Sequence, residues 1–255
     1  MLRGIYNAAS GMLAQQAVQD AVAGNLANIN TVGYKQDVPT FRALHEMALR
    51  RNESAQRAST SIGDLGMGVE FDSVSTDFNE GTLAATHNAT DLALSGAGFF
   101  TVLTGAGERY TRSGQFHLQP GAKDAAGKPQ GFLADDSGNA LMGLKGRILL
   151  SSTANLTVDD RGNVFDGKTK LDQLKLIDAN PSMLNKVGSN LYTINGATKT
   201  ADVMVKQGFL EQSNVSAVSS MVRMITVQRA YEAAQKAVLA QDDTLAKTVN
   251  ELPRT

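Results

Sequence analysis

Two acidic clusters are the residues of this sequence best suited to chemistry. Residues 135–139 read DDSGN and residues 159–163 read DDRGN. Adjacent carboxylates suggest either a calcium loop or the acid–base pair of a glycoside hydrolase. Neither cluster has the alternating ligands and distal Glu of a calcium loop, and two carboxylates on one turn are badly placed to flank a glycosidic bond. Because Asp, Asn and Gly favour tight turns, we predict two turns between strands.

No other group of residues forms a catalytic or ligand-binding motif. The three histidines, His45, His87 and His117, have no close spacing that would indicate shared metal ligation. Residues 96–98 and 105–107 are both Gly-Ala-Gly, but neither continues to the third glycine or the Gly-Lys-Ser/Thr of a phosphate loop. The absence of cysteine excludes disulfides, thiolate metal sites and cysteine nucleophiles. We therefore expect no catalytic residue, no cofactor and no metal site.

The composition narrows the class of protein further. The chain has 255 residues and a net charge of −1, with 42% hydrophobic residues but only 5% aromatic residues and no Trp. Such a chain is expected to build an aliphatic core and lacks the positive field that nucleic-acid binding requires. No stretch approaches the roughly 20 apolar residues of a membrane span, and the N-terminus has no apolar h-region of a cleaved signal peptide. Export that reads an uncleaved N-terminus stays open.

Residues 4–29 are predicted to form a helix. They contain no proline, and their apolar or neutral side chains recur at intervals of three and four. Arg3 and Asp20 are the only charged residues from position 1 to 34, so this helix has too little polar surface to stand alone. We expect it to end in the Asn- and Gly-containing residues 28–33. Its first stripe comprises Ile5, Ala8, Met12, Gln15, Gln19, Val22, Leu26 and Ile29, and its second comprises Leu2, Ala9, Leu13, Ala17 and Ala21.

A longer helix is predicted at the C-terminus, from a cap at Ser213 or Asn214 to about Asn250. Pro253 lies just beyond it, and Glu232–Lys236 and Asp243–Lys247 are pairs spaced by four residues in the favourable orientation. Val218, Val222 and Ile225 begin a second apolar face. The main stripe comprises Met224, Val227, Tyr231, Ala234, Val238, Gln241, Leu245, Thr248 and Leu252.

The middle of the chain has a different pattern. Residues 35–70 are polar and indicate an extended connector, with a short helix over 40–50 as an alternative. Residues 71–212 contain short apolar or β-branched runs, such as residues 92–95 and 156–158, separated by Gly, Asn and Asp. The sequence therefore predicts an α+β fold, with residues 1–34 and 213–255 paired as a helical coiled coil, an extended connector and a central all-β domain over 71–212.

The helical stripes allow two interpretations. An apolar stripe at helical spacing more often packs into an ordinary core than into an assembly interface. Here, however, the stripes lie at opposite ends of the chain and each helix has more than one apolar face. At 1.5 Å per residue the helices would span about 35–40 Å and about 50 Å, lengths that suit a coiled-coil pair. Such a pair buries one face of each helix, and the remaining faces need neighbouring subunits.

Several blocks along the chain resemble the flagellar rod and hook protein family. Residues 25–35 (NLANINTVGYK) are similar to the N-terminal signature of that family, although Gly24 departs from the Asn often found before it. The matches run in the expected order from one end of the chain to the other. The other blocks are residues 91–100 (DLALSGAGFF), 110–116 (YTRSGQF), 180–181 (NP) with Leu184 and 188–192 (GSNLY), 207–215 (QGFLEQSNV) and 228–232 (QRAYE).

The resemblance implies a structural subunit of the bacterial flagellar basal-body rod. Its terminal helices would form the inner layer of a tubular drive shaft and its β domain an outer layer. The implied partners are copies of itself, neighbouring rod and hook proteins, the flagellar type III export apparatus and the surrounding basal-body ring, in the periplasm or cell-wall zone, without nucleic acid or membrane insertion. The expected assembly residues are Ile5, Met12, Leu13, Val22, Leu26 and Ile29 in the first helix and Met224, Val227, Tyr231, Val238, Leu245 and Leu252 in the second, with a signature turn at Asn28, Thr31, Gly33 and Tyr34.

Three alternatives stay open at this point. The long connector favours the distal-rod type, but proximal-rod and hook proteins share the same blocks. A secreted adhesin or surface-layer protein would share the β-rich middle without requiring both ends for assembly. An enzyme with an unrecognised site in the β domain is the third. The sequence also leaves open whether the terminal helices are ordered before assembly, because their stripes are unfavourable in water.

Overall fold

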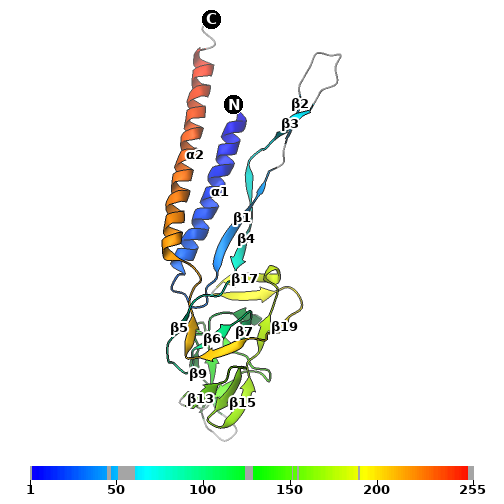
Figure 1. Cartoon of the computed structure of the whole chain (residues 1–255), viewed down its shortest axis with the longest axis vertical. Helices are drawn as coiled ribbons and strands as arrows, with labels where there is room; N and C mark the ends of the chain where they lie inside the picture. Colours follow the sequence, from blue (N-terminus) through cyan, green and yellow to red (C-terminus); the bar gives the residue numbers. More distant parts are fainter. Residues whose placement is uncertain are drawn as a thin grey trace. The chain divides into compact units, whose positions relative to one another are not determined.

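The computed structural model describes residues 2–44, 47–50, 61–123, 129–150, 152–153, 155–188 and 190–251. The chain forms two compact units. Unit 1 comprises Met1–Ala27, Asp37–Asp77 and Ser216–Thr255, and unit 2 comprises Asn28–Gln36 and Phe78–Val215. The predicted α+β class is confirmed, with helices at the two ends of the chain and a mostly β middle (Figure 1).

Unit 1 contains both helices, α1 (Leu2–Ala27) and α2 (Ala217–Glu251). The cap of α2 differs from the prediction: Ser216, rather than Ser213 or Asn214, accepts a hydrogen bond at its side chain from the Ser219 amide, at 3.4 Å. Asn214 does not serve as the cap because its side chain is bonded to the backbone of Gln36 and Asn79. The helix therefore begins a few residues later than the sequence suggested.

The two helices lie side by side and run in opposite directions (Figure 1). Gly4, near the start of α1, lies against the side-chain amide of Gln241 in the second half of α2, where an added Cβ would overlap that amide. Val22 and Val227 are buried. The remaining stripe residues of α2 from Met224 to Thr248 are half-buried, whereas most residues between them are exposed. The predicted stripe of α2 is thus the face that α1 covers.

Among the described residues, unit 1 also contains four strands, three of them in the region predicted as a connector and the fourth running from its end into the predicted β domain. β1 (Gln36–Ala43) pairs with β4 (Val69–Asp77), and β2 (Met47–Arg50) pairs with β3 (Ser61–Leu65). The Thr40 hydroxyl donates to the Ser73 carbonyl at 2.9 Å, and the Phe41 and Phe71 rings meet edge to face at 6.2 Å. The alternative of a helix over 40–50 is wrong for the described residues there, because this segment pairs with a distant strand that local spacing does not reveal.

The end of α1 is tied to β1 inside unit 1. The Asn25 side chain is buried, donates to the Asp37 carbonyl at 2.8 Å and accepts from the Asp37 amide at 2.9 Å. Nearer the start of α1, the Val69 amide of β4 donates to the Ser10 hydroxyl at 3.4 Å. These bonds attach the strand pair to α1.

Unit 2 is built from short strands, most of them in one ten-stranded sheet with the central order β12-β10-β11-β7-β8-β18-β17. Among the described residues, the paired strands of unit 2 run antiparallel. The predicted runs at 92–95 and 156–158 are confirmed as β6 and β13. The strands are β5 (Leu83–Ala85), β6 (Leu92–Ser95), β7 (Phe99–Thr104), β8 (Gly107–Thr111), β9 (His117–Lys123), β10 (Pro129–Ala134), β11 (Ala140–Leu141), β12 (Leu149–Leu150), β13 (Leu156–Val158), β14 (Asn163–Asp166), β15 (Thr169–Gln173), β16 (Leu176–Asp178), β17 (Leu184–Gly188), β18 (Leu191–Ile194), β19 (Lys199–Thr200), β20 (Met204–Gln207) and β21 (Phe209–Glu211), with a 3₁₀ turn η1 (Pro181–Met183).

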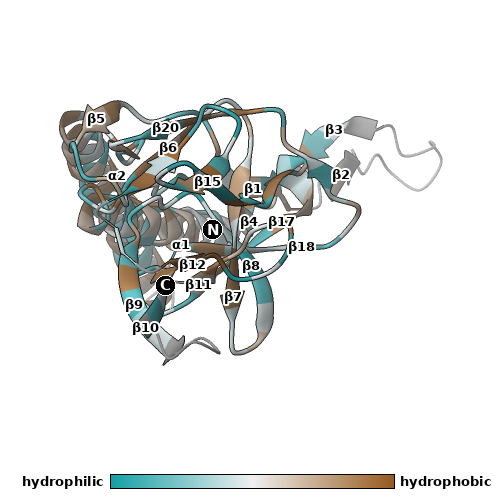
Figure 2. Cartoon of the chain, turned by 90° about the horizontal axis from the view of Figure 1, so that it is seen from below, coloured by the Kyte–Doolittle hydropathy of each residue, from teal (hydrophilic) through white to brown (hydrophobic). Residues whose placement is uncertain are grey.

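The core of unit 2 is mostly aliphatic, as the composition predicted. Leu92, Leu133 and Leu141 are fully buried around the Phe100–Phe116 pair, whose rings meet edge to face at 5.5 Å. A smaller cluster gathers Phe99, Ile177 and Tyr192. Hydrophobic segments, brown in Figure 2, lie on these strands as well as on the helices. No helix among the described residues is long and apolar enough to cross a membrane.

Candidate functional site

The two acidic clusters are turns, as predicted. The Asp135 carboxylate accepts the amides of Ser137 and Asn139 at 3.0 and 2.8 Å, and Asn139 Nδ2 at 2.9 Å. Asp159 repeats the same three bonds with Arg161 and Asn163 at 3.0, 2.8 and 2.7 Å. Each carboxylate is therefore used by its own turn.

The histidines do not form a metal centre in the described part of the chain. No three His, Cys, Asp or Glu side chains gather there as a metal would require. His117 lies 3.8 Å from Asp136, with both side chains largely exposed to water. His45 lies outside the described residues.

The expected assembly residues of α1 lie on more than one face. Val22 is buried, while Ile5, Met12 and Leu26 are half-buried in unit 1. Leu13 points outward with 67% of its surface exposed. Ile29 follows α1 and belongs to unit 2, where it is half-buried.

The expected assembly residues of α2 lie mainly toward α1. Val227 is buried, Leu252 lies outside the described residues, and the rest are half-buried: Met224, Tyr231, Val238 and Leu245. A second set of apolar side chains faces away from α1 at the start of the helix. It comprises Val218, Met221, Val222 and Ile225. The sequence had indicated this set as a second apolar face of the helix, but its residues were not among the expected assembly residues.

The signature turn is a closed loop of hydrogen bonds in unit 2. The Thr31 amide donates to the Asn28 carbonyl at 3.1 Å, and the Thr31 hydroxyl donates to the Asn28 side chain at 3.1 Å. The Tyr34 amide donates to the Thr31 carbonyl at 3.2 Å. Gly33 has a φ of +65°, and a Cβ there would lie 2.5 Å from the Arg112 carbonyl. Only glycine fits this combination of left-handed backbone and close approach.

Three residues of unit 2 that are distant in sequence contact the turn. The Gly33 amide donates to the Glu211 carbonyl at 2.7 Å, and Asn190 Nδ2 donates to the Val32 carbonyl at 2.8 Å. The Lys186 ammonium lies 4.1 Å from the centre of the Tyr34 ring. The signature turn is therefore part of the hydrogen-bonded structure of unit 2.

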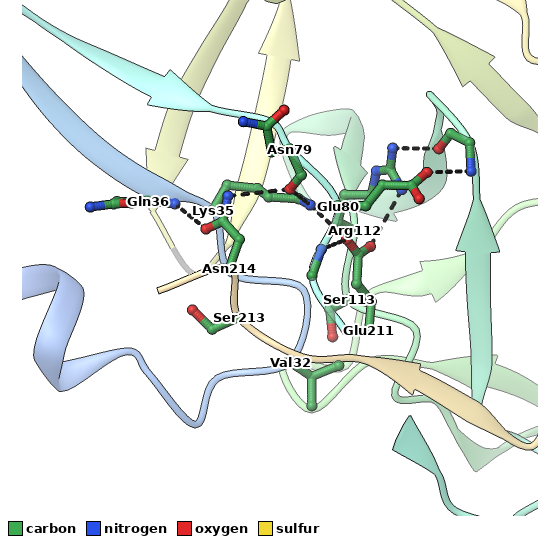
Figure 3. A network of polar contacts seen from close by, with 12 residues as sticks. Val32, Lys35, Gln36, Asn79, Glu80, Arg112, Ser113, Glu211, Ser213 and Asn214 are labelled. Carbon is green, nitrogen blue, oxygen red and sulfur yellow. Dashed lines mark hydrogen bonds and ion pairs between the residues drawn. The ribbon is translucent and has the colours of Figure 1, made fainter. Parts of the chain in front are cut away.

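A buried cluster of charges lies directly after the turn (Figure 3). Lys35 Nζ donates to Glu211 Oε1 at 2.6 Å, and Arg112 Nη1 donates to Glu211 Oε2 at 3.3 Å. The exposed fractions of the three side chains are 0%, 1% and 3% for Lys35, Glu211 and Arg112. We call these three residues the junction, because each comes from a different family-like block of the sequence.

Backbone groups supply further polar contacts of the junction. Lys35 Nζ also donates to the Asn79 carbonyl at 2.7 Å, and the Gly81 amide donates to Glu211 Oε1 at 3.0 Å. Arg112 Nη2 donates to the Gly96 carbonyl at 2.7 Å, while the Gly96 amide donates to Glu80 Oε1. Burial lowers the pKa of Lys35 below its ordinary value, although Glu211 opposes that change.

The junction was missed at the sequence level because its members are far apart. Lys35 and Glu211 are separated by 176 positions, and Arg112 and Glu211 by 99. Each lies inside a block that resembled the rod and hook family, so the resemblance was the only available signal. Spacing alone carries no information about pairs this distant.

A cavity of about 430 Å³ lies beside the signature turn in unit 2. Ile29 and Val32 line it from the turn, Ala84 from β5, Leu210 from β21 and Val215 from the last residue of the unit. The residues that follow α1 and those that precede α2 therefore border the same space.

Comparison with known proteins identifies relatives along the whole chain. The model for "Flagella basal body rod protein" matches residues 5–35, and that for "Flagellar basal body rod FlgEFG protein C-terminal" matches residues 206–252. The chain is 29% identical to the flagellar basal-body rod protein FlgG of Bacillus subtilis (strain 168), covering 98% of this chain and 99% of that protein.

Two further relatives have similar coverage. Identity to the flagellar basal-body rod protein FlgG of Borreliella burgdorferi is 30% over the full length of both chains. Identity to the flagellar basal-body rod protein FlgF of Caulobacter vibrioides is 33%, covering 92% of each chain. Lys35 and Glu211 lie in the two matched end segments, so the junction joins the segments that the family models describe.

Proposed function

Because this chain belongs to the family of flagellar basal-body rod proteins, and is most like the distal-rod type, we propose that it is a non-catalytic building block of the rod. Copies of it would assemble through their terminal helices into a hollow shaft that transmits torque to the hook. The observation that carries this proposal is the resemblance to rod proteins over the full length of the chain.

We assign assembly to the helical parts of the chain. Residues 1–34 with 213–255 would form a coiled-coil inner layer, residues 71–212 an outer layer, and residues 35–70 the connection between them. The exposed side chains of Val218, Val222 and Ile225 support this assignment, because contiguous apolar surface of this kind marks interaction sites. The predicted inward stripe would hold the pair together, and the outward set would contact neighbouring copies.

The proposed setting follows from the same family membership. The partners would be other copies, neighbouring rod and hook proteins, the flagellar type III export apparatus and the surrounding basal-body ring. The location would be the flagellar basal body, in the periplasm or cell-wall zone. A second candidate is another axial position, proximal-rod or hook-type, because the 33% identity to a basal-body rod protein named FlgF is as high as the identities of 29% and 30% to FlgG proteins.

The proposal can be tested in a strain that lacks this protein. Electron microscopy of its basal bodies should show rods that are missing or end early, and the level at which they stop separates the distal from the proximal position. An intact rod in that strain would contradict the proposal. An adhesin or surface-layer protein would leave the rod unchanged and would keep its binding after loss of either chain end.

Two aspartate substitutions test the helix faces in the same strain. Val238→Asp places a charge against α1, and Val222→Asp places one on the outward face. We expect both variants to abolish rod assembly and motility because a buried charge at either face is unfavourable. The matched control is Val187→Asp in β17, whose exposed fraction of 55% is close to the 59% of Val222. Normal rods with Val222→Asp would contradict the outward-face assignment.

A further inference from the structure

The parts of unit 2 nearest the two helices in sequence lie next to each other. The Gly33 amide is bonded to the Glu211 carbonyl at 2.7 Å, and the Asn214 amide to the Tyr34 carbonyl at 3.4 Å. The Gln36 amide donates to Asn214 Oδ1 at 2.8 Å. Along the chain, α1 ends immediately before Asn28 and α2 begins two residues after Val215. Unit 2 therefore holds the segment that follows α1 and the segment that precedes α2 against each other.

The junction charges depend on both of these segments. Glu211 comes from the C-terminal segment and neutralises Lys35 from the N-terminal segment, and it also contacts Arg112. Without Glu211, two cations would remain buried with carbonyl oxygens as hydrogen-bond partners, and the exposed carboxylate of Glu80 would still act on Lys35. Without Lys35, Glu211 would still have Arg112. A buried ion left without its partner is strongly unfavourable, so the two losses are unequal.

The shape of the signature turn is a second, steric reason why the N-terminal segment depends on the Glu211 segment. Gly33 lies against the backbone of Arg112 and Ser113, where no side chain fits, and its amide bonds to Glu211. A shift of one residue would place Val32 or Tyr34 at this position. The segment therefore fits in one register only, and that register brings Lys35 to Glu211.

We propose that the junction is a two-part latch: residues 28–36 dock on the β unit only when the Glu211 segment is already in place. The latch holds the residues that follow α1 in the chain beside those that precede α2. Because the two attachment points are held together, the entropy lost when the helices pair is smaller than for two free chain ends. This role goes beyond the proposed rod function and is present in a single unassembled chain.

Hydrogen exchange on the unassembled full-length chain tests the latch. In Glu211→Gln, we expect the Gly33 and Gln36 amides to exchange about 100-fold faster, because the charge that holds Lys35 and Arg112 is lost. Amides of the β7–β8 pair, such as that of Val102, should change by less than about threefold. The matched control is Glu108→Gln, which removes a half-exposed ion pair with Lys175 and should leave Gly33 and Gln36 unchanged.

A second substitution separates a latch from general loss of stability. Lys35→Met should accelerate exchange less than Glu211→Gln, and adding it to Glu211→Gln should slow exchange, because one of the two unpaired cations is removed. The latch is refuted by unchanged exchange at Gly33 and Gln36 in Glu211→Gln, by an equal rise at the β7–β8 amides, or by purely additive effects in the double variant. Since no assembly is involved, these results are independent of whether the chain forms rods.

Discussion

The two units use the same kinds of apolar residue in opposite ways. In unit 2, Leu92 and Phe100 are fully enclosed by strands from the same chain. In unit 1, Val218 on α2 and Tyr6 on α1 have 74% and 71% of their surfaces exposed. A sheet folded on itself can enclose its core, whereas two antiparallel helices can cover only one face of each other. This difference is what we expect if, as proposed, the exposed apolar faces of unit 1 are covered by other copies of the chain.

The charged residues show the same contrast. Unit 2 encloses Lys35, Arg112 and Glu211 together, each almost without exposed surface. In unit 1, Arg42 pairs with Glu70 at 2.9 Å while both side chains stay largely in water. Exposed pairs contribute little to stability, but removal of one partner from a buried cluster is strongly destabilising. Substitutions should therefore have larger effects on the unassembled chain in unit 2 than in unit 1.

Truncation of an apolar side chain should show the largest difference between the units. Phe100→Ala should reduce the free energy of unfolding of unit 2 by about 3–5 kcal/mol, because it leaves a cavity in an enclosed core. Val238→Ala on half-buried α2 should cost about 1 kcal/mol or less, since alanine also favours the helix. Denaturant unfolding of the unassembled chain, followed separately in each unit, measures both. Equal losses would break the contrast between a closed and an open unit.

Replacement of a glycine by alanine should change the free energy of unfolding in opposite directions in the two units. Gly33→Ala should destabilise unit 2 by about 2–4 kcal/mol, because a Cβ meets the Arg112 backbone in a left-handed conformation. Gly24→Ala in α1, where an added Cβ meets nothing within 4 Å, should stabilise the helix by up to about 1 kcal/mol. Thermal unfolding of both variants provides the comparison. A destabilised Gly24→Ala variant would show that α1 is more tightly enclosed than its exposure indicates.

The smallest expected effect concerns a polar turn at the surface of unit 2. Burial acts most strongly on the pKa of Asp159 and raises it, but donors from Asn163 and Arg161, together with Lys170, bring the pKa below its ordinary value. The carboxylate therefore stabilises the fold above its unfolded pKa of about 3.9, and this contribution is lost as the pH falls through the folded pKa. Because the group is near the surface, we expect under about 1 kcal/mol.

A pH series on one variant checks that sign. Asp159→Asn should lower the melting temperature slightly at pH 7, and the difference from the unsubstituted chain should disappear near pH 2. A difference that grows toward low pH would contradict the direction of the pKa change. Asp37→Asn in unit 1 serves as a comparison outside the two acidic turns.

Local signals along the chain were sufficient to predict the two helices and the two acidic turns. Apolar residues at intervals of three and four predicted α1 and α2. The DDSGN and DDRGN clusters predicted two turns, and the structure shows that both turns have the same pattern of hydrogen bonds. The start of α2 was misplaced because Asn214, a good cap residue in isolation, is bonded to Gln36 and Asn79. The strand pair β1–β4 was missed because its two members are separated by a long stretch of polar sequence.

The sequence by itself determined the helices, the β-rich middle, the aliphatic core and, through its end blocks, the family. These properties depend on the identity and spacing of neighbouring residues, which the chain states directly. Only the tertiary structure decided that the α2 stripe faces α1, that Val218 and Ile225 face outward, and that Lys35, Arg112 and Glu211 meet. Such contacts are selected by the free energy of the whole fold, in which residues far apart in sequence become neighbours and neighbours in sequence face opposite ways.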